Sequence, residues 1–129
     1  MTNEPPAPGS IAWWDLTVPD ATAVRDFYAA VAGWRAEPVD MGDYDDFAMA
    51  SAATGETVAG ICHARGDNAG LPAQWLPYVA VPDVEASVRV AIERGGEAVT
   101  AVRDAGGARF VVVRDPAGAA FALIETATE

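Results

Sequence analysis

The sequence contains no lysine, a single histidine and a single cysteine. Eight arginines supply all of its side-chain positive charge, against 19 aspartates and glutamates, and the formal net charge is −11. A chain this acidic lacks the basic surface that nucleic-acid phosphates or an anionic membrane require, so neither partner is expected. The lone Cys62 cannot form an intramolecular disulfide, which fits a reducing compartment.

Long hydrophobic runs are also missing. Apolar residues make up 51% of the 129 residues but fall in short stretches, so no membrane-spanning helix is expected. The N-terminal residues lack the basic region and apolar run of a secretory signal. We therefore expect a cytoplasmic protein of single-domain length. Its acidity either keeps it soluble or attracts a cationic ligand.

The chain repeats itself at a fixed spacing, which we call the repeat offset. Four landmarks keep the same separation without a gap: Val18-Pro19-Asp20 with Val81-Pro82-Asp83, Gly33 with Gly96, Phe47 with Phe110, and Gly55 with Gly118. Any one of these matches is weak, but several in one register indicate a duplicated structural unit.

Each copy predicts a strand, a helix and three further strands. The first strands, at residues 11–18 and 75–81, are each followed by a proline that breaks the strand pattern. Asp20 and Asp83 then occupy helix N-cap positions. Helical spacing places Val24, Phe27 and Val31 on one face of the first helix. The remaining strands are predicted at residues 35–39, 46–50 and 57–62 in the first copy and at 98–102, 109–113 and 119–124 in the second.

The expected organisation is one α+β domain of two tandem βαβββ modules. Residues 1–9 are predicted to be a flexible lead-in, and residues 10–126 the domain. Module one covers residues 10–63, a linker rich in glycine and proline covers 64–73, and module two covers 74–126.

Two stretches of the sequence resemble the vicinal oxygen chelate superfamily. They are the opening run Trp14-Asp15-Leu16-Thr17-Val18-Pro19-Asp20, with Phe27-Tyr28 and Gly33-Trp34 behind it, and the closing run Phe110-Val111-Val112-Val113-Arg114-Asp115-Pro116-Ala117-Gly118. The resemblance covers residues 10–126 and implies a curved mixed sheet forming a half-barrel around one cavity. The superfamily includes glyoxalase I, extradiol dioxygenases, fosfomycin-modifying enzymes and bleomycin-resistance proteins, so the fold alone does not define an activity.

The resemblance also implies where a metal would be held. In metal-binding members the first strand of each module carries a ligand seven residues before the helix-opening aspartate, and the last strand carries another. These positions hold Trp13, Leu76 and Ala122, and the repeat offset gives Ala59 as the fourth. None of these side chains donates a lone pair to a metal. We therefore expect no metal and no other cofactor.

Strand alternation predicts which side chains line the cavity. If position 13 faces inward, its alternate neighbours and their counterparts in the other strands do so as well. The predicted ligand-binding residues are Trp13, Asp15, Ala59, Ile61, Leu76, Tyr78, Ala122 and Ile124. They form a wall of small and apolar side chains with an indole, a phenol and a carboxylate, which suits an aromatic ligand.

Several of these residues also have a purely structural interpretation. Trp13 and Tyr78 either contact the ligand or fill the core. Asp15 pairs with an arginine, anchors a cationic group, or acts as a catalytic acid or base. Trp14 and Trp34 are assigned to the core or an interface, and Trp75 to a rim or dimer contact.

Three functions remain open. The first is metal-independent binding of a small molecule, in the manner of a bleomycin-resistance protein that sequesters an aromatic or cationic natural product and so confers antibiotic resistance. The second is an enzyme of the same superfamily (a lyase, isomerase or dioxygenase-like protein) that is metal-free and uses Asp15. The third is a regulatory module that acts through protein contacts. A homodimer is expected from the resemblance.

Overall fold

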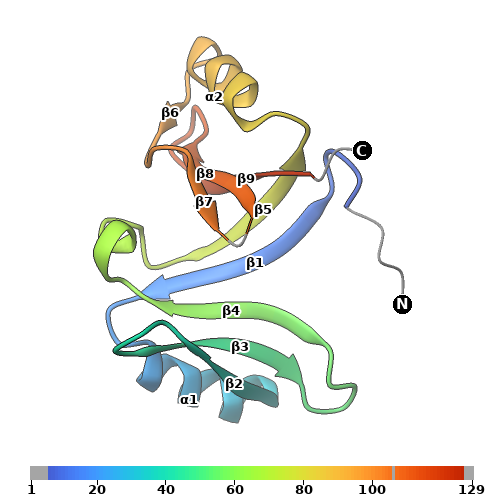
Figure 1. Ribbon diagram of the computed structural model, residues 1–129, viewed down its shortest axis with the longest axis vertical. Coiled ribbons are helices and arrows are strands. Elements are labelled where there is room, and N and C mark those ends of the chain that lie inside the picture. The colour runs from blue at the N-terminus through green and yellow to red at the C-terminus, as the bar shows by residue number, and fades with distance from the viewer. Residues whose placement is uncertain (1–5, 106, 127–129) are drawn as a thin grey trace. The chain divides into compact units, whose positions relative to one another are not determined.

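The computed structural model describes residues 6–105 and 107–126, which form two compact units (Figure 1). The first unit is Trp14–Trp75, and the second joins the segment that ends at Trp13 to the segment that begins at Leu76. Each unit combines strands with one α-helix, which confirms the predicted α+β class. Among the described residues, no helix is long and apolar enough to cross a membrane.

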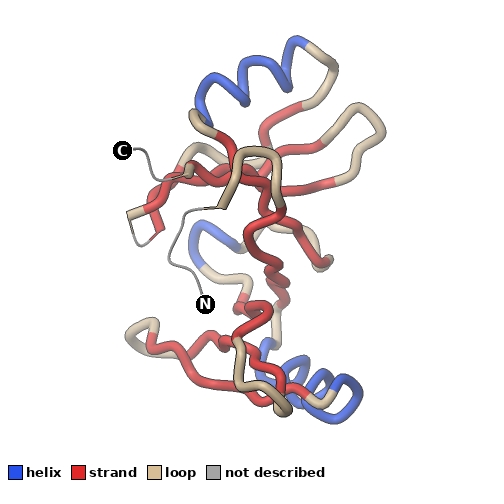
Figure 2. The backbone as a smooth tube through the Cα atoms, turned by 90° about the vertical axis from the view of Figure 1, so that its right-hand side faces the viewer, coloured by secondary structure: helices blue, strands red, loops and turns tan. Residues whose placement is uncertain are grey.

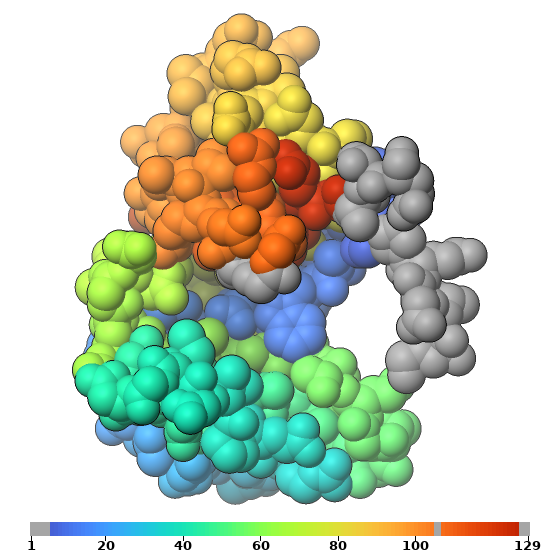
Figure 3. Space-filling model, viewed as in Figure 1, coloured from blue at the N-terminus to red at the C-terminus, as the bar shows by residue number. Residues whose placement is uncertain are grey.

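The first unit contains a four-stranded sheet in the order β2-β3-β4-β1. Strand β1 runs parallel to β4, and the other neighbours are antiparallel. Strand β2 is the edge strand of this group, and its atoms, with those of β3, form the teal surface in Figure 3. The elements are β1 (Ile11–Val18), α1 (Ala21–Ala32), β2 (Trp34–Asp40), β3 (Asp45–Ser51), β4 (Thr57–His63) and a 3-10 turn η1 (Gly66–Asn68).

Helix α1 begins and ends where the sequence predicts. The Asp20 carboxylate accepts a hydrogen bond from the Ala23 N–H at 3.1 Å, and Gly33 ends the helix with φ of 69°. The predicted buried face is wrong for Phe27 and Val31, whose side chains are 57% and 67% exposed. The helix instead turns Ala21, Val24 and Tyr28 inward, because Tyr28 joins a cluster of aromatic rings.

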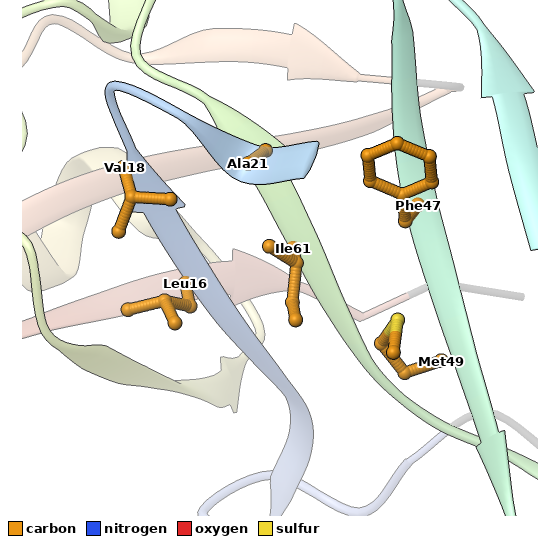
Figure 4. Close-up of a cluster of buried hydrophobic side chains, with 6 residues drawn as sticks. All are labelled: Leu16, Val18, Ala21, Phe47, Met49 and Ile61. Atoms are coloured by element: carbon orange, nitrogen blue, oxygen red, sulfur yellow. The ribbon is translucent and has the colours of Figure 1, made fainter. Parts of the chain in front are cut away.

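The core of the first unit lies between α1 and one face of its sheet (Figure 4). Side chains from β1, β3 and β4 meet the first residue of the helix there. The buried residues are Leu16, Val18, Ala21, Phe47, Met49 and Ile61. Burying a large apolar side chain contributes about 1.5–3 kcal/mol, so this cluster holds the helix on the sheet.

The second unit contains strands in the order β5-β9-β8-β6, and a further short strand, β7, pairs with β8. Strand β5 runs parallel to β9. The elements are β5 (Trp75–Val81), α2 (Val84–Glu93), β6 (Glu97–Ala98), β7 (Arg103–Ala105), β8 (Ala108–Arg114) and β9 (Ala120–Glu125). Helix α2 packs over a core of Val84, Val111, Val113 and Leu123. The helices and strands of both units can be followed in Figure 2.

The strand predicted at residues 98–102 is wrong. Two short strands, β6 and β7, replace it. The N–H groups of Val99 and Thr100 both donate to the Val112 carbonyl oxygen, at 2.8 and 3.3 Å, which interrupts the regular ladder between them.

The predicted lead-in is hydrogen-bonded to β5 at its end. The Gly9 N–H donates to the Ala80 carbonyl oxygen at 2.7 Å, and the Ala80 N–H donates to the Ser10 carbonyl oxygen at 2.9 Å. Residues 1–5 lie outside the described residues.

Candidate functional site

In the first unit, the predicted site residue Asp15 lies on the sheet face opposite α1. Its neighbours Leu16 and Val18 point into the core, so alternation sends Asp15 and Thr17 to the other face. Thr17 is buried and Asp15 is partly buried. Asp15 therefore faces away from the helix, as strand alternation predicts, and its contact with a ligand stays a prediction.

A thiol and two carboxylates meet on this face. The Cys62 Sγ donates to Asp15 Oδ2 at 3.4 Å, and the buried Asp46 carboxylate accepts the His63 N–H at 2.9 Å. Burial raises the pKa of the Cys62 thiol well above its usual range, and the negative charges of Asp15 and Asp46 raise it further. The thiol therefore stays protonated and acts as a hydrogen-bond donor, not as a nucleophile.

The predicted placement of Ala59 and Ile61 on the same face as Asp15 is wrong. Asp15 pairs with Gly60, whereas the gap-free repeat requires Ala59. Ile61 is fully buried in the core against α1, and Ala59 is buried opposite Met49 on that same helix-facing side. Neither Ala59 nor Ile61 shares a face with Asp15.

The register between β1 and β4 causes this difference. Asp15 pairs with Gly60, whereas its counterpart Tyr78 pairs with Ala122, so β4 lies one residue away from the register that the repeat offset requires. A shift of one residue in the pairing places the opposite set of side chains on each face. A β-bulge at Val58 does not contribute, because Met49–Ala59 and Phe47–Ile61 match Val112–Ala122 and Phe110–Ile124 at the repeat offset.

The second unit follows the predicted alternation. Tyr78 pairs with Ala122 and Ala80 with Ile124, on the face opposite α2, because Val79 and Leu123 belong to the helix-facing core. The Tyr78 and Phe110 rings lie 6.0 Å apart. Leu76 precedes Tyr78 by two positions on the same strand and is buried. Ligand contact by these residues stays a prediction.

The family's metal positions can be tested against this register. With the observed pairing of β1 with β4 and of β5 with β9, they hold Trp13, Gly60, Leu76 and Ala122, and none of these offers a nitrogen, oxygen or sulfur lone pair from its side chain to a metal. Within residues 6–105 and 107–126, no three His, Cys, Asp or Glu side chains are grouped so as to hold a metal ion.

The strand ends carry one feature that sequence reasoning missed. The His63 Nδ1 accepts the Ala21 N–H at 3.5 Å, at the start of α1. In the second unit, Glu125 Oε2 accepts the Val84 N–H at 3.1 Å, at the start of α2. Both residues end the last strand of their module, so the shared position could have revealed a shared capping role. The accepting Nδ1 requires the tautomer with hydrogen on Nε2.

A second missed feature is a pocket of about 440 Å³ on the helix-facing side of the first unit. It is lined by Trp14, Trp34, Val58, Ala59 and Trp75. We call it the tryptophan pocket. The sequence analysis assigned Trp14 and Trp34 to the core or an interface and Trp75 to a rim or dimer contact. These residues are distant in sequence, and only the fold brings them together.

Comparison with known proteins identifies the family. Residues 13–124 match the family described as "Glyoxalase-like domain", and the chain belongs to it. This confirms the resemblance to the glyoxalase, bleomycin-resistance and dioxygenase superfamily.

Two solved structures and one curated relative extend the comparison. The chain is 35% identical to "Anthracycline biosynthesis protein DnrV" of Streptomyces peucetius over 113 residues, covering 76% of this chain and 40% of that protein. A superfamily member from Vibrio splendidus has a TM-score of 0.57 at 13% identity, covering 88% and 96% of the two chains. Methylmalonyl-CoA epimerase from Mycobacterium tuberculosis has a TM-score of 0.55 at 15% identity, covering 89% and 86%. These structural likenesses show the fold alone.

Proposed function

We propose that the protein binds a small aromatic, cationic molecule without a metal and without catalysing a reaction. The observation that carries this proposal is the Asp15 carboxylate, which lies on the sheet face opposite α1 beside a neutral thiol donor. A carboxylate held on a partly buried face attracts a cation more strongly than one in open solvent.

The composition of the same face supports a binding role. Its strands β3 and β4 contribute the small residues Ala48, Ala50 and Gly60 to the face that carries Asp15. The buried Asp46 adds a second negative charge near Cys62. With a net charge of −11, the whole chain favours a cationic over an anionic ligand.

The curated relative suggests a ligand class. Its name refers to anthracycline biosynthesis. Anthracyclines combine a planar aromatic ring system with an amino sugar that is cationic at neutral pH. The chain spans about two fifths of that relative's length, so the role of the whole relative comes to this protein only as a proposal. On this proposal the protein sequesters such a natural product in the cytoplasm as a homodimer and thereby confers resistance to it.

The direct test is titration of the purified protein with daunorubicin, followed by calorimetry and by the probe's own fluorescence. We expect binding to wild-type protein and about a tenfold weaker affinity for Asp15→Asn, because one charge-assisted contact is lost. Asp43→Asn is the matched control, since it removes the same charge from an exposed loop position, and its affinity should stay at the wild-type value.

Two results would contradict the proposal. If Asp15→Asn and Asp43→Asn bind daunorubicin equally well, Asp15 is not the anchor. If elemental analysis of freshly purified protein shows a stoichiometric divalent metal, binding is not metal-independent. Light scattering after size exclusion tests the homodimer separately.

A further inference from the structure

We propose that the tryptophan pocket is a second binding site, which takes a planar aromatic ring system of two or three fused rings. This site lies on the helix-facing side of the first unit, whereas Asp15 lies on the opposite side. Trp14 and Asp15 are consecutive residues of β1, so their side chains leave opposite faces of the strand. The two sites can therefore be tested independently.

The walls of the tryptophan pocket are held in place by ring contacts. Trp34 stacks on Tyr28 with centroids 5.5 Å apart and planes inclined by 21°. Trp75 stands nearly perpendicular to both rings, at 5.4 Å from Tyr28 and 5.9 Å from Trp34. Such edge-to-face and stacked pairs stabilise one another beyond simple burial. The indoles of Trp34 and Trp75 are thus positioned before any ligand arrives, which lowers the entropic cost of binding.

One polar group at the pocket wall, the Trp75 indole N–H, is satisfied internally. The Trp75 Nε1–H donates to the Tyr28 hydroxyl oxygen at 2.9 Å. This bond fixes the Trp75 ring and removes its N–H from competition for a ligand. The wall therefore presents π faces and aliphatic carbon, from Val58 and the buried Ala59, to an incoming ring.

The size and opening of the pocket suit a small molecule. Its volume of about 440 Å³ is that of a typical small-molecule site, roughly 300–1,000 Å³. Trp14 is 41% exposed and Val58 is 38% exposed, so the rim is open to solvent while Trp34 and Trp75 are half-buried behind it. Indole faces attract cations, and the chain's net charge adds to this preference, so a cationic ring should bind better than an anionic one of equal size.

The test uses indole N–H signals in ¹⁵N-labelled protein. The chain has four tryptophans, at positions 13, 14, 34 and 75, and each gives one indole signal. We expect proflavine, a planar tricyclic cation, to shift the signals of Trp14, Trp34 and Trp75, and anthraquinone-2-sulfonate, a tricyclic anion, to shift them less. The signals are assigned from single tryptophan-to-phenylalanine variants.

A blocking variant gives the affinity readout. Val58→Arg places a long cationic side chain at the rim and should weaken proflavine binding about tenfold or more. Val31→Arg adds the same charge to an exposed position of α1 outside the pocket and should bind as wild type. Equal proflavine affinity for the two variants would overturn the proposal.

The remaining outcomes separate this site from the Asp15 site and from an interface. Shifts confined to Trp13, with sensitivity to Asp15→Asn, would refute the tryptophan pocket and leave the proposed function standing. Daunorubicin binding that is lost in Val58→Arg but kept in Asp15→Asn would refute Asp15 as the anchor and support the tryptophan pocket. If the three signals shift on dilution alone, in step with dissociation of a dimer, the pocket is a contact between copies and not a ligand site.

Discussion

The two modules begin their helices at equivalent positions of the repeat, but they hold the helix starts with different groups. In the first unit, the neutral His63 imidazole accepts the Ala21 N–H. In the second, the Glu125 carboxylate accepts the Val84 N–H and is held by Arg109 through bonds of 2.8 and 3.1 Å. A carboxylate also interacts favourably with the positive end of the helix dipole, whereas the imidazole only accepts the hydrogen bond from the backbone N–H. One backbone requirement is thus met by two different chemical groups.

The modules differ again in the register of their last strands. Tyr78 matches Asp15 at the repeat offset, but their strand partners do not match each other: Asp15 pairs with Gly60, and Tyr78 pairs with Ala122, which the offset matches to Ala59. The structural counterpart of Ile61 is therefore Leu123 and not Ile124. A duplicated sequence shows that two modules share an architecture, but pairing between strands decides which side chains face the core.

The largest expected effect separates Ile61 from Ile124, which the gap-free repeat treats as equivalent. Ile61→Ala removes a fully buried side chain and should lower the free energy of unfolding by about 2–5 kcal/mol. Leu123→Ala, at the true counterpart, should cost a similar amount, and Ile124→Ala clearly less, because Ile124 is partly exposed. Urea denaturation measures all three. A larger loss for Ile124→Ala than for Leu123→Ala would show that the register is wrong.

A smaller effect distinguishes the paired glycines Gly96 and Gly33. A Cβ at Gly96 would lie 2.5 Å from the Arg114 carbonyl oxygen, so Gly96→Ala forces the backbone apart and should cost about 2–3 kcal/mol. Gly33 has a positive φ of 69° but open space around it, so Gly33→Ala should cost only about 1–2 kcal/mol. Thermal unfolding of both variants gives the order, and a greater loss for Gly33→Ala would contradict it.

The smallest effect tests the Glu125 cap of helix α2 through pH. Hydrogen bonds from Arg109 and from the Val84 N–H lower the pKa of Glu125 in the folded protein. Its charged form therefore stabilises the fold above the ordinary glutamate pKa of about 4.3, and this contribution disappears as the pH falls through the lower folded-state value. Glu125→Gln should thus be less stable than wild type at pH 7, and the difference should narrow in acid.

Glu85→Gln is the control for this measurement, because Glu85 also contacts Arg109 but is 55% exposed and accepts no bond from the Val84 N–H. We expect it to change stability less than Glu125→Gln. A difference for Glu125→Gln that stays constant from pH 7 to strongly acidic solution would show that the carboxylate charge contributes nothing.

Local signals in the sequence predicted much of this fold. Asp20 and Asp83 start the helices as expected, since an N-cap depends on residues close in sequence. The faces of β1 and β5 were also predicted, because their alternation is unbroken. Ala59 and Ile61 were placed on the wrong face because β4 pairs with β1 one residue away from the repeat offset, and no local pattern reveals the pairing of distant strands. The tryptophan pocket was missed for a related reason, since tertiary packing alone joins its residues.

Val58 is the residue at which β4 of the first module departs from its counterpart in the second. In genetic terms, the bulge corresponds to one codon. Deleting that codon would join Thr57 to Ala59, so the pairs Ala50–Thr57 and Met49–Ala59 would follow one another as a regular ladder. Ile61 would still lie opposite Phe47 in the core and Cys62 would stay beside Asp15, so this in-frame deletion would remove the bulge and leave both faces of the strand unchanged.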